Sequence, residues 1–279
     1  MEEKQGNIKI SSENMMPIIK KWLYSDKDIF LREIVANGVD AITKFKKLVE
    51  MGEAKAEPDE EYRIDVFVDE KAKTLTVQDN GIGMTKEDLE KNLGTIAKSG
   101  SLDFKTENQS DNIDIIGQFG VGFYSAFMVA QKVTVISRAQ GADTAWKWES
   151  KGVEGYTITE ADKDDVGTEI ILVLKDDTDS ENYSEYLDDY TIANLVKKYS
   201  DYIRFPITMY REKSRQKPKP EDAGDDYKPE YETYTELETL NSMVPIWKRP
   251  KNEVKDEDYN EFYKNKFMDY SDPLRVITT

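Results

Sequence analysis

The sequence predicts an α+β fold, a two-layer sandwich in which a mostly antiparallel sheet is covered on one face by helices. Two observations support this prediction. Stretches with alternating apolar and polar residues recur between residues 62 and 174, as strands with one buried face require. Patterns with the period of a helix come before, between and after these stretches. A sheet under a layer of helices lets both kinds of element bury their apolar sides.

The elements follow one another in a definite order. Helices are expected over residues 12–23, 28–50, 86–93, 123–129 and 185–203. Strands are expected over residues 62–68, 74–78, 132–138, 144–149, 155–159, 168–174 and 207–210. One helix has a clear start, because the Thr85 hydroxyl can cap its first turn and Glu87 and Asp88 favour the positive end of the helix dipole.

The composition changes sharply after residue 210. Residues 211–240 carry many charges, few aliphatic side chains and three prolines, a composition unsuited to a packed core. We therefore expect an N-terminal domain over residues 1–210, a charged linker over residues 211–240, and the truncated beginning of a further domain over residues 241–279. A surface loop within one domain is the alternative for the linker.

The composition also excludes several classes of function. With no Cys and no His among 279 residues, the chain has no disulfides and no thiolate metal sites, and acid–base chemistry must use carboxylates or Lys. A net charge of −17 disfavours nucleic acid as a partner, because phosphate binding depends on Lys and Arg. The N-terminus lacks the pattern of a secretory signal, and no apolar run reaches the length of about 18 residues that a membrane span needs. We expect no membrane association and a cytoplasmic location.

Glu33, Asn37 and Asp40 form the most informative pattern. They are four and three residues apart in the helix expected over 28–50, so they share one helical face. An amide oxygen suits Mg²⁺, which takes few protein ligands beside substrate phosphates. Glu33, one turn earlier, could orient or deprotonate a water. A solvated polar face is the alternative.

A second pattern joins a strand end to a glycine corner. Asp79 follows the alternating stretch 74–78 and precedes Gly81 and Gly83, which allow backbone and ligand to approach closely. A carboxylate only accepts hydrogen bonds, and adenine presents a donor amine where guanine presents an oxygen. Asp79 is therefore predicted to read adenine. The alternative is an Asn-Gly hairpin turn, which the helix expected at 86–93 disfavours.

Gly117, Gly120 and Gly122 precede the helix expected at 123–129. Glycine-rich turns that open a helix expose backbone N–H groups to anions, so this segment is predicted to cradle phosphates. It is not a Walker A loop, because Phe123 and Tyr124 stand where Lys and Ser or Thr are required. Close packing of a helix would explain the glycines equally well.

Residues 92–114 are expected to form a mobile loop. Gly94 and Gly100 flank a short segment, and residues 105–114 have almost no apolar side chain. Long loops in compact domains are usually functional or disordered. We expect a lid over bound nucleotide whose closure limits turnover; an ordinary connection is the alternative.

Together these motifs resemble those of the ninety-kilodalton heat-shock (Hsp90) chaperones, particularly the bacterial members. The resemblance rests on YSDKDIFLREI, DNGIGM, NLGTIAKSGS and IGQFGVGFYSAFMVA, in that order, and extends over nearly the whole chain. It implies the GHKL (Bergerat) ATPase fold shared with gyrase, mismatch-repair and histidine-kinase ATPases, with ATP or ADP and Mg²⁺ as ligands. Residues 243–250 and 259–264 resemble the opening of the family's middle domain, truncated here.

The resemblance implies roles on the phosphate side. Glu33 would be the general base on the attacking water, and Asn37 would hold Mg²⁺ against the phosphates. Asp40 would support water-mediated contacts, while Asn92 and Lys98 would lie toward the sugar and phosphates. The backbone that covers the phosphate chain would be that of Gln118, Phe119, Gly120, Val121, Gly122 and Phe123.

The resemblance also implies roles around the base. Asp79 would bind the adenine amine, with Gly83 and Thr168 helping through ordered water. Met84 would pack on the ring.

The chain departs from the family pattern within the first motif helix. Where the family reads Ser-Asn-Ala-Ser-Asp-Ala, residues 36–41 read Ala-Asn-Gly-Val-Asp-Ala. Glycine inside a helix costs about 1 kcal/mol relative to alanine, and Val39 removes a hydroxyl from the polar row. We expect nucleotide binding to persist, with a looser helix around Gly38 and altered turnover.

The expected function is that of an ATP-dependent stress-response chaperone that binds unfolded client proteins. The resemblance implies a homodimer formed through a C-terminal domain, and a middle-domain arginine that reaches the γ-phosphate; neither is within these 279 residues. Since an arginine finger contributes about 10³-fold or more in rate, we expect ATP binding with slow hydrolysis. The alternatives are a nucleotide-binding module with little or no turnover, and another ATPase of the same superfamily, of the histidine-kinase or topoisomerase type.

Overall fold

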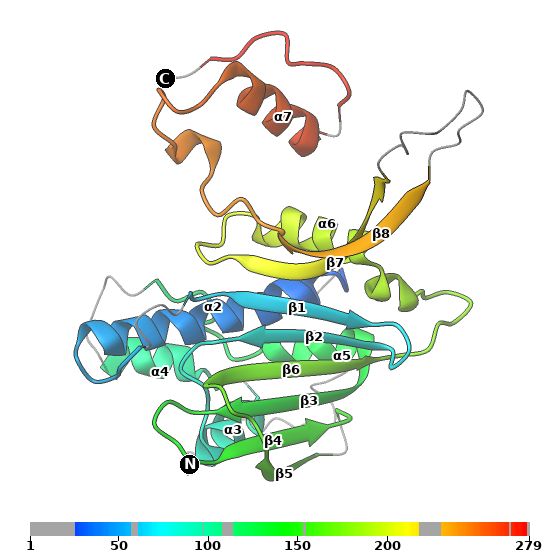
Figure 1. Ribbon diagram of the computed structural model, residues 1–279. Coiled ribbons are helices and arrows are strands. Elements are labelled where there is room, and N and C mark those ends of the chain that lie inside the picture. The colour runs from blue at the N-terminus through cyan, green and yellow to red at the C-terminus, as the bar shows by residue number, and fades with distance from the viewer. Residues whose placement is uncertain are drawn as a thin grey trace, which may run out of the picture.

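The computed structural model describes residues 26–56, 61–96, 98–107, 114–152, 155–217, 230–267 and 269–277, and these contain one eight-stranded sheet (Figure 1). The strands are β1 (Ile64–Asp69), β2 (Thr74–Asp79), β3 (Ala130–Arg138), β4 (Ala145–Ser150), β5 (Tyr156–Ala161), β6 (Gly167–Leu174), β7 (Ile207–Gln216) and β8 (Tyr231–Thr239). The α-helices are α2 (Ile29–Glu50), α3 (Lys86–Leu93), α4 (Gly100–Glu107), α5 (Ala126–Val129), α6 (Asp189–Ser200) and α7 (Asp256–Phe267). Short 3-10 helices are η2 (Gly122–Ser125), η3 (Ser184–Leu187) and η4 (Ile246–Lys248). The helix expected over residues 12–23 lies outside the described residues.

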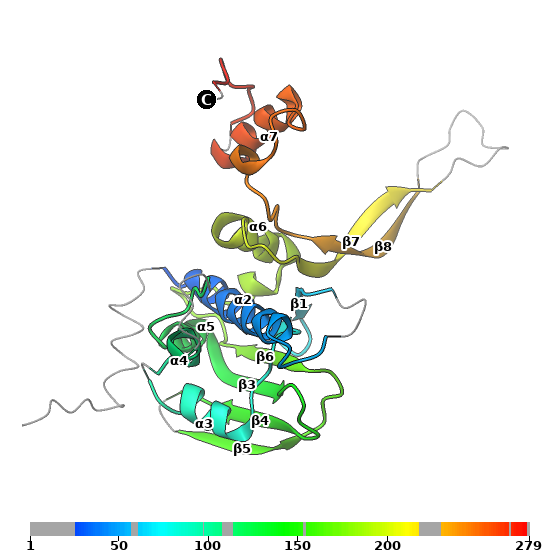
Figure 2. The same cartoon turned by 90° about the vertical axis from the view of Figure 1, so that its left-hand side faces the viewer.

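The sheet has the strand order β5-β4-β3-β6-β2-β1-β7-β8. Neighbouring strands are antiparallel except β1 and β7, which are parallel. Helices α2, α3, α4 and α5 lie on the same side of the sheet (Figure 2). The predicted α+β sandwich with a mostly antiparallel sheet is therefore confirmed.

Helix α2 is the long helix that lies across the sheet. Its sequence places apolar side chains at helical spacing, and Phe30, Leu31, Ile34, Ile42 and Phe45 are all almost completely buried. Burying one side chain of this size stabilises the fold by about 1.5–3 kcal/mol. The apolar stripe thus fixes which face of α2 points to the sheet and which face remains for polar side chains.

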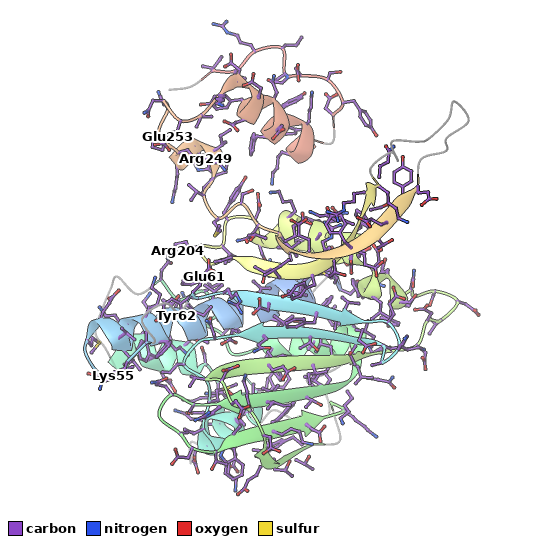
Figure 3. The ribbon with its side chains drawn as sticks, in the orientation of Figure 1. Lys55, Glu61, Tyr62, Arg204, Arg249 and Glu253 are labelled. Atoms are coloured by element: carbon purple, nitrogen blue, oxygen red, sulfur yellow. The ribbon has the colours of Figure 1, made fainter. Side chains whose placement is uncertain are left out.

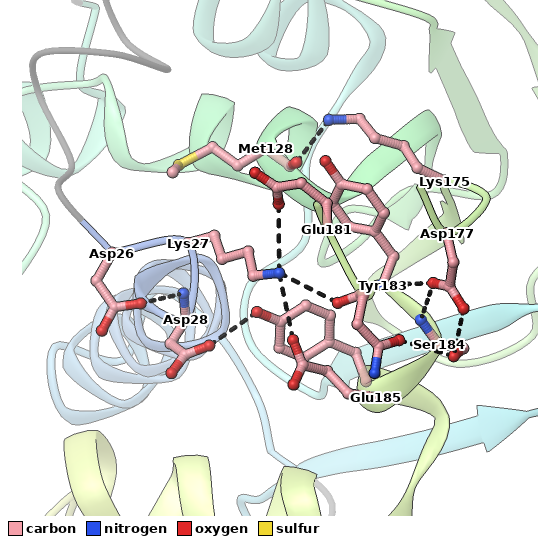
Figure 4. Close-up of polar contacts among 12 residues, drawn as sticks. Asp26, Lys27, Asp28, Met128, Lys175, Asp177, Glu181, Tyr183, Ser184 and Glu185 are labelled. Atoms are coloured by element: carbon pink, nitrogen blue, oxygen red, sulfur yellow. Dashed lines mark hydrogen bonds and ion pairs between the residues drawn. The ribbon is translucent and has the colours of Figure 1, made fainter. Parts of the chain in front are cut away.

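A cluster that we call the α2 clasp holds the start of this helix. The clasp consists of Lys27, Asp28, Tyr183, Glu185 and Tyr186, of which Figure 4 labels the first four. The Lys27 ammonium lies 3.3 Å from a Glu185 oxygen and 5.1 Å from the centre of the Tyr183 ring. The Tyr186 hydroxyl donates to Asp28 Oδ1 at 2.8 Å, so this carboxylate binds a neighbouring element and does not cap its own helix. The first turn of α2 is therefore tied to η3.

Residues 211–240, expected to be a charged linker, extend the sheet in their described parts. They form most of β7 and all of β8, paired antiparallel from Thr208 and Thr239 at one end to Gln216 and Tyr231 at the other. Most of their side chains are exposed, and oppositely charged residues face each other across the two strands. Composition did not predict this hairpin because backbone pairing and charge, not a core, support it. The domain boundaries at 210 and 240 stay a prediction.

Two further elements differ from expectation. The stretch over 92–114, expected to be a loop, contains helix α4. The helix expected over 185–203 is divided into η3 and α6, because Asp188 is extended and its side chain accepts a hydrogen bond from the Thr191 N–H at 2.8 Å as a new N-cap. Lid closure stays a prediction, since residues 108–113 are not described.

The last described segment, with η4 and α7, follows the sheet (Figure 3, where Arg249 and Glu253 mark it). The Trp247 ring centre lies 5.2 Å from that of Tyr202 in the loop after α6 and 6.0 Å from that of Phe262 in α7. A cavity of about 360 Å³ lies in this segment, and the residues that line it include no carboxylate and no amide side chain. It therefore lacks the groups of the predicted site. In the described part of the chain, we find no helix with the length and apolar character of a membrane span.

Candidate functional site

The polar face of α2 lies against the glycine-rich segment, as the sequence predicts. A Cβ added to Gly122 would overlap the Glu33 carboxylate, and one added to Gly117 would lie 3.4 Å from Asn37 Oδ1 and 3.1 Å from Asp40 Oδ2. Bare backbone therefore reaches all three side chains; at Gly122 only glycine leaves room for this approach, and at Gly117 a side chain would be a tight fit. Asp40 is 1% exposed, so this row is not simply a solvated face.

Asp40 anchors the segment through its carboxylate. Its two oxygens accept hydrogen bonds from the Ile116 and Gly117 N–H groups, both at 2.8 Å. Burial raises the pKa of Asp40, and these two bonds act in the opposite direction. The structure thus gives Asp40 a direct role, which is to hold the segment on α2, while the water-mediated role implied by the resemblance stays a prediction.

Lys44 is a polar neighbour that the sequence analysis missed. Burial lowers its pKa, while the carboxylates of Asp40, Asp88 and Asp79 act to raise it. Lys44 lies four residues after Asp40 in α2, so continuing the row of Glu33, Asn37 and Asp40 by one turn would have found it.

Arg32 is a second neighbour that was missed. Its Nε donates to Glu33 Oε1 at 2.9 Å, and its Nη2 contacts the same oxygen. Adjacent residues on a helix do not normally face each other, so no spacing rule signals this pair. Arg32 holds the Glu33 carboxylate close to the glycine segment.

On the other side of the site, three side chains lie side by side on neighbouring strands, at what we call one level of the sheet. Asp79 in β2 is paired in register with Thr168 in β6, and Thr168 is paired with Ser137 in β3. Directly paired residues point to the same face of a sheet, and here it is the face that the helices cover. All three are buried, at 6%, 4% and 0% exposed.

Asp79 is a buried acceptor at this level. Its Oδ1 accepts from the Gly81 N–H at 2.9 Å, in the glycine corner that follows the strand. Burial raises the pKa of Asp79 to about 7, although the N–H groups of Gly81 and Thr168 and the charge of Lys163 lower it. At neutral pH this carboxyl is thus close to its midpoint, unlike an exposed Asp.

Ser137 connects this level to the glycine corner, and no sequence pattern signals it. Its hydroxyl accepts from the Met84 N–H at 2.8 Å and lies 2.8 Å from Thr168 Oγ1 and 3.1 Å from the Gly167 carbonyl oxygen. A serine near the end of an alternating strand is ordinary, and only the register of three strands reveals its partners.

Gly38 has a packing reason in this structure. A Cβ at this position would lie 3.2 Å from the Asp79 Cβ and 3.3 Å from Ile64 Cδ1, tighter than ordinary contact. Helix α2 continues without interruption through Gly38 to Glu50. The glycine therefore brings α2 close to the strand that ends at Asp79, and this contact joins the two halves of the site.

The corner at Gly83 should not tolerate a side chain. Gly83 has φ +68°, and a Cβ there would overlap the Arg138 carbonyl oxygen. We expect Gly83→Ala to lower the free energy of unfolding by about 2–3 kcal/mol more than Gly141→Ala, because overpacking adds to backbone strain. Gly141 is a matched control, with φ +77° and no atom within 4 Å of the added Cβ. Urea denaturation of both variants measures the difference, and equal losses would contradict close packing at Gly83.

Asn92 and Lys98 lie near the site but differ in what they offer it. The Asn92 side chain lies against Gly100, and its Oδ1 is buried without a hydrogen-bond partner among the described residues. Such an acceptor is available to a ligand hydroxyl. The Lys98 ammonium lies 3.2 Å from Asp103, while its carbonyl oxygen lies against Gly120, which has φ +63°.

Three side chains of the glycine-rich segment differ in their surroundings. Gln118 is exposed and Phe119 is 80% exposed. The Phe123 ring is buried, with its centre 5.5 Å from that of Trp148 in an edge-to-face contact. The helix expected at 123–129 is the short pair η2 and α5, with four residues each.

The donor set fits a metal held mainly by its ligand. Among the described residues, no three or more acidic side chains gather as a protein-only metal site would need. Asn37 provides one neutral oxygen beside the glycine backbone. Mg²⁺ typically takes one or two protein ligands together with phosphate oxygens and water, so this arrangement suits Mg²⁺ with a nucleotide.

Comparison with known proteins identifies the family. The model of the family described as histidine kinase-, DNA gyrase B-, and HSP90-like ATPase matches residues 25–171, more than half of the chain. The model of the Hsp90 protein family matches residues 185–232 and 219–278.

Individual relatives agree with the family models. The chain is 51% identical to the chaperone protein HtpG of Clostridium acetobutylicum over 272 residues, which cover 96% of this chain and 42% of that protein. It is 51% identical to HtpG of Clostridium botulinum over 282 residues (100% and 43%) and 50% identical to HtpG of Clostridium perfringens over 278 residues (99% and 43%). The chain thus spans less than half the length of these curated relatives. Motifs, fold and comparisons agree: the chain belongs to the histidine kinase-, DNA gyrase B- and HSP90-like ATPase family, and within it to the Hsp90 proteins.

Proposed function

We propose that this chain binds ATP and ADP with Mg²⁺ and hydrolyses ATP slowly, as the nucleotide-dependent part of a chaperone. The observation that carries the proposal is the convergence of α2, the glycine-rich segment and the end of β2. Glu33, Asn37 and Asp40 lie against bare backbone, and Gly38 lies against Asp79. The relatives named HtpG are chaperones by name, which supports the same conclusion.

On the phosphate side, Glu33 would accept a proton from the attacking water, with Arg32 holding its carboxylate. Asn37 would hold Mg²⁺, which supplies charge neutralisation at the phosphates when bound. Backbone N–H groups from Gln118 to Phe123 would bind the phosphate oxygens. Asp40 would keep this segment in place through the hydrogen bonds it accepts.

On the base side, Asp79 would accept a hydrogen bond from the adenine amine. Thr168 and Gly83 would help to bind the base through ordered water. Met84 is partly buried against the core, where its side chain could pack on the ring. The unpartnered Oδ1 of Asn92 would accept from a sugar hydroxyl, and Lys98 would neutralise phosphate charge after leaving Asp103.

The remaining proposals concern the longer protein. Closure of the segment around α4 over bound ATP would change how this domain meets its neighbours and its twin in a homodimer, and so drive folding of unfolded client proteins in the cytoplasm. We do not assign nucleic acid or membrane partners. Hydrolysis by these 279 residues alone should be slow, because the resemblance implies that the arginine reaching the γ-phosphate comes from the middle domain.

Isothermal titration calorimetry of the chain with ADP, with MgCl₂ or with EDTA, tests the proposal. We expect saturable binding of one ADP per chain that weakens when Mg²⁺ is removed, because Asn37 then has no ion to share with the phosphates. ATP added beforehand should compete with ADP for the same site and weaken its apparent binding. Absence of binding at millimolar ADP would refute the proposal.

A further inference from the structure

We propose that Ser137 sets the direction of the Thr168 hydroxyl and thereby makes the base corner select purines with a 6-amino group over those with a 6-oxo group. Ser137 is then a positioning residue for base specificity, since it acts through Thr168. The inference rests on the proposed function of Asp79 and Thr168 as the base corner, and it adds a residue and a mechanism of selection.

The argument begins with the partners of Ser137. A serine hydroxyl has one proton to donate and two lone pairs to accept with. The Met84 N–H can only donate, so the contact at 2.8 Å uses one lone pair of Ser137. The Gly167 carbonyl oxygen can only accept, so the contact at 3.1 Å uses the Ser137 proton.

The contact between the two hydroxyls then has one possible direction. Ser137 Oγ and Thr168 Oγ1 are 2.8 Å apart, and geometry alone allows either to donate. Because the Ser137 proton goes to Gly167, Thr168 must donate to the remaining lone pair of Ser137. All three contacts of Ser137 are thereby satisfied, as expected for a side chain that is 0% exposed.

The consequence reaches the ligand through Thr168. Its only hydroxyl proton is directed at Ser137, so Thr168 Oγ1 can offer a ligand lone pairs alone. Asp79, the neighbour of Thr168 in register, also offers only lone pairs when ionised. The Asp79 carboxylate and Thr168 Oγ1 are then two hydrogen-bond acceptors, which suit the donor N6 amine of adenine. They disfavour the O6 oxygen of hypoxanthine or guanine, which is itself an acceptor.

Calorimetric titration with ADP and with inosine diphosphate (IDP) tests the inference. IDP differs from ADP in having a 6-oxo group and an N1 proton, with the same sugar and phosphates. We expect Ser137→Ala to lower the ratio of the IDP dissociation constant to the ADP dissociation constant about tenfold. IDP should bind this variant more tightly than it binds the wild type, because the freed Thr168 hydroxyl can rotate and donate a hydrogen bond to O6. Titrations at pH 8.5, above the pKa of about 7 for Asp79, keep that carboxyl mostly ionised.

Three variants accompany this measurement. Ser137→Thr keeps a hydroxyl and should keep the wild-type ratio. Ser150→Ala removes a buried hydroxyl of the adjacent strand β4, which donates to Gly155 O at 2.6 Å, and should also keep the ratio. Thr168→Val should weaken ADP about tenfold and leave IDP unchanged, since it removes an acceptor and no donor.

The outcomes separate this inference from the proposed function. If the wild type binds neither nucleotide, the proposed function fails. If the wild type binds ADP but Ser137→Ala keeps its ratio within twofold, or Ser137→Thr behaves as Ser137→Ala does, the inference alone is overturned. Should Ser137→Ala not fold, Thr168→Val decides: a loss of IDP affinity larger than that of ADP would mean that Thr168 donates to the ligand, against the inference.

Discussion

Replacing Asp79 by Asn is expected to weaken ADP binding at least about 100-fold while the protein stays folded. The carboxylate is the charged acceptor of the proposed base corner, and hydrogen bonds to charged groups contribute about 1.5–3 kcal/mol. Asn has only one acceptor oxygen: if this oxygen accepts from the Gly81 N–H, the NH₂ group faces the donor amine of adenine, and if the amide turns, the NH₂ group faces the Gly81 N–H. Calorimetry with ADP and Mg²⁺ measures the loss, and affinity within fivefold of the wild type would reject Asp79 as the reader of the base.

The same variant should be more stable than the wild type at alkaline pH. The pKa of Asp79 is about 7 in the folded protein and 3.8 as the ordinary value for an unfolded chain. Between these values the folded state keeps a proton that the unfolded state has released, so the free energy of unfolding falls as pH rises from about 4 to about 7 and remains lower above that. Three pKa units correspond to an upper limit of about 4 kcal/mol. Asn has no such charge, so its variant should lack this fall.

Urea denaturation at pH 5 and pH 8 checks this linkage. The difference in unfolding free energy between Asp79→Asn and the wild type should be larger at pH 8. The exposed Asp165 provides a control, because Asp165→Asn removes a carboxylate that is not buried. A difference that is the same at both pH values would show that Asp79 is not forced toward its protonated form by burial. If Asp79→Asn loses ADP binding and also gains stability, the buried carboxylate of Asp79 serves ligand binding and lowers the stability of the fold.

Glu33→Ala is expected to lower ATP hydrolysis about 10²–10⁴-fold, the usual contribution of a general base. The carboxylate lies where a Cβ of Gly122 would be, next to the backbone proposed to cover the phosphates, and Arg32 holds it there. ADP affinity should stay within about threefold, because base catalysis acts in the transition state. Phosphate release under single-turnover conditions measures the first effect and calorimetry the second.

A control for Glu33 lies on the same helix. Glu50→Ala removes an exposed carboxylate at the end of α2, where it pairs with Lys47 at 3.5 Å, and should leave phosphate release unchanged. Equal rates for the wild type and Glu33→Ala would remove the general-base role and favour a module that binds nucleotide without turnover. A parallel fall of ADP affinity and rate would instead indicate that Glu33 shapes the binding site.

The sequence was sufficient where local rules determine structure. Thr85 caps α3 in a reciprocal capping box with Asp88, and α3 spans the residues expected from that cap. The alternating stretches near 74–78 and 168–174 are β2 and β6, each with one buried face. The row of Glu33, Asn37 and Asp40 does share a face, because helical spacing alone decides it. The catalytic and binding roles of these residues stay predictions.

The sequence was insufficient where strands distant in the chain meet. Ser137 has its partners in β6 and after β2, so its role depends on the register of three strands. Strand β8 was missed because strand pairing in a charged hairpin leaves no hydrophobic alternation to detect. From the sequence alone, Gly38 is only a destabilising glycine inside a helix. The structure shows why a glycine fits there: the Asp79 Cβ, which belongs to another element, lies so close that a side chain would be a tight fit.

The strand pairing of the sheet also connects Asp79 to the point where the chain leaves the sheet, at Leu240. Asp79 is paired with Ile64 in β1, and Ile64 is paired with Ile207 at the start of β7. The Ile207 carbonyl accepts from the N–H of Leu240 at 2.8 Å, just where the chain leaves β8. Three strand spacings, from β2 through β1 and β7 to the end of β8, separate Asp79 from the point where the chain leaves the sheet. The chain that leaves the sheet after residue 240 is therefore linked to Asp79 by a continuous row of paired backbone positions.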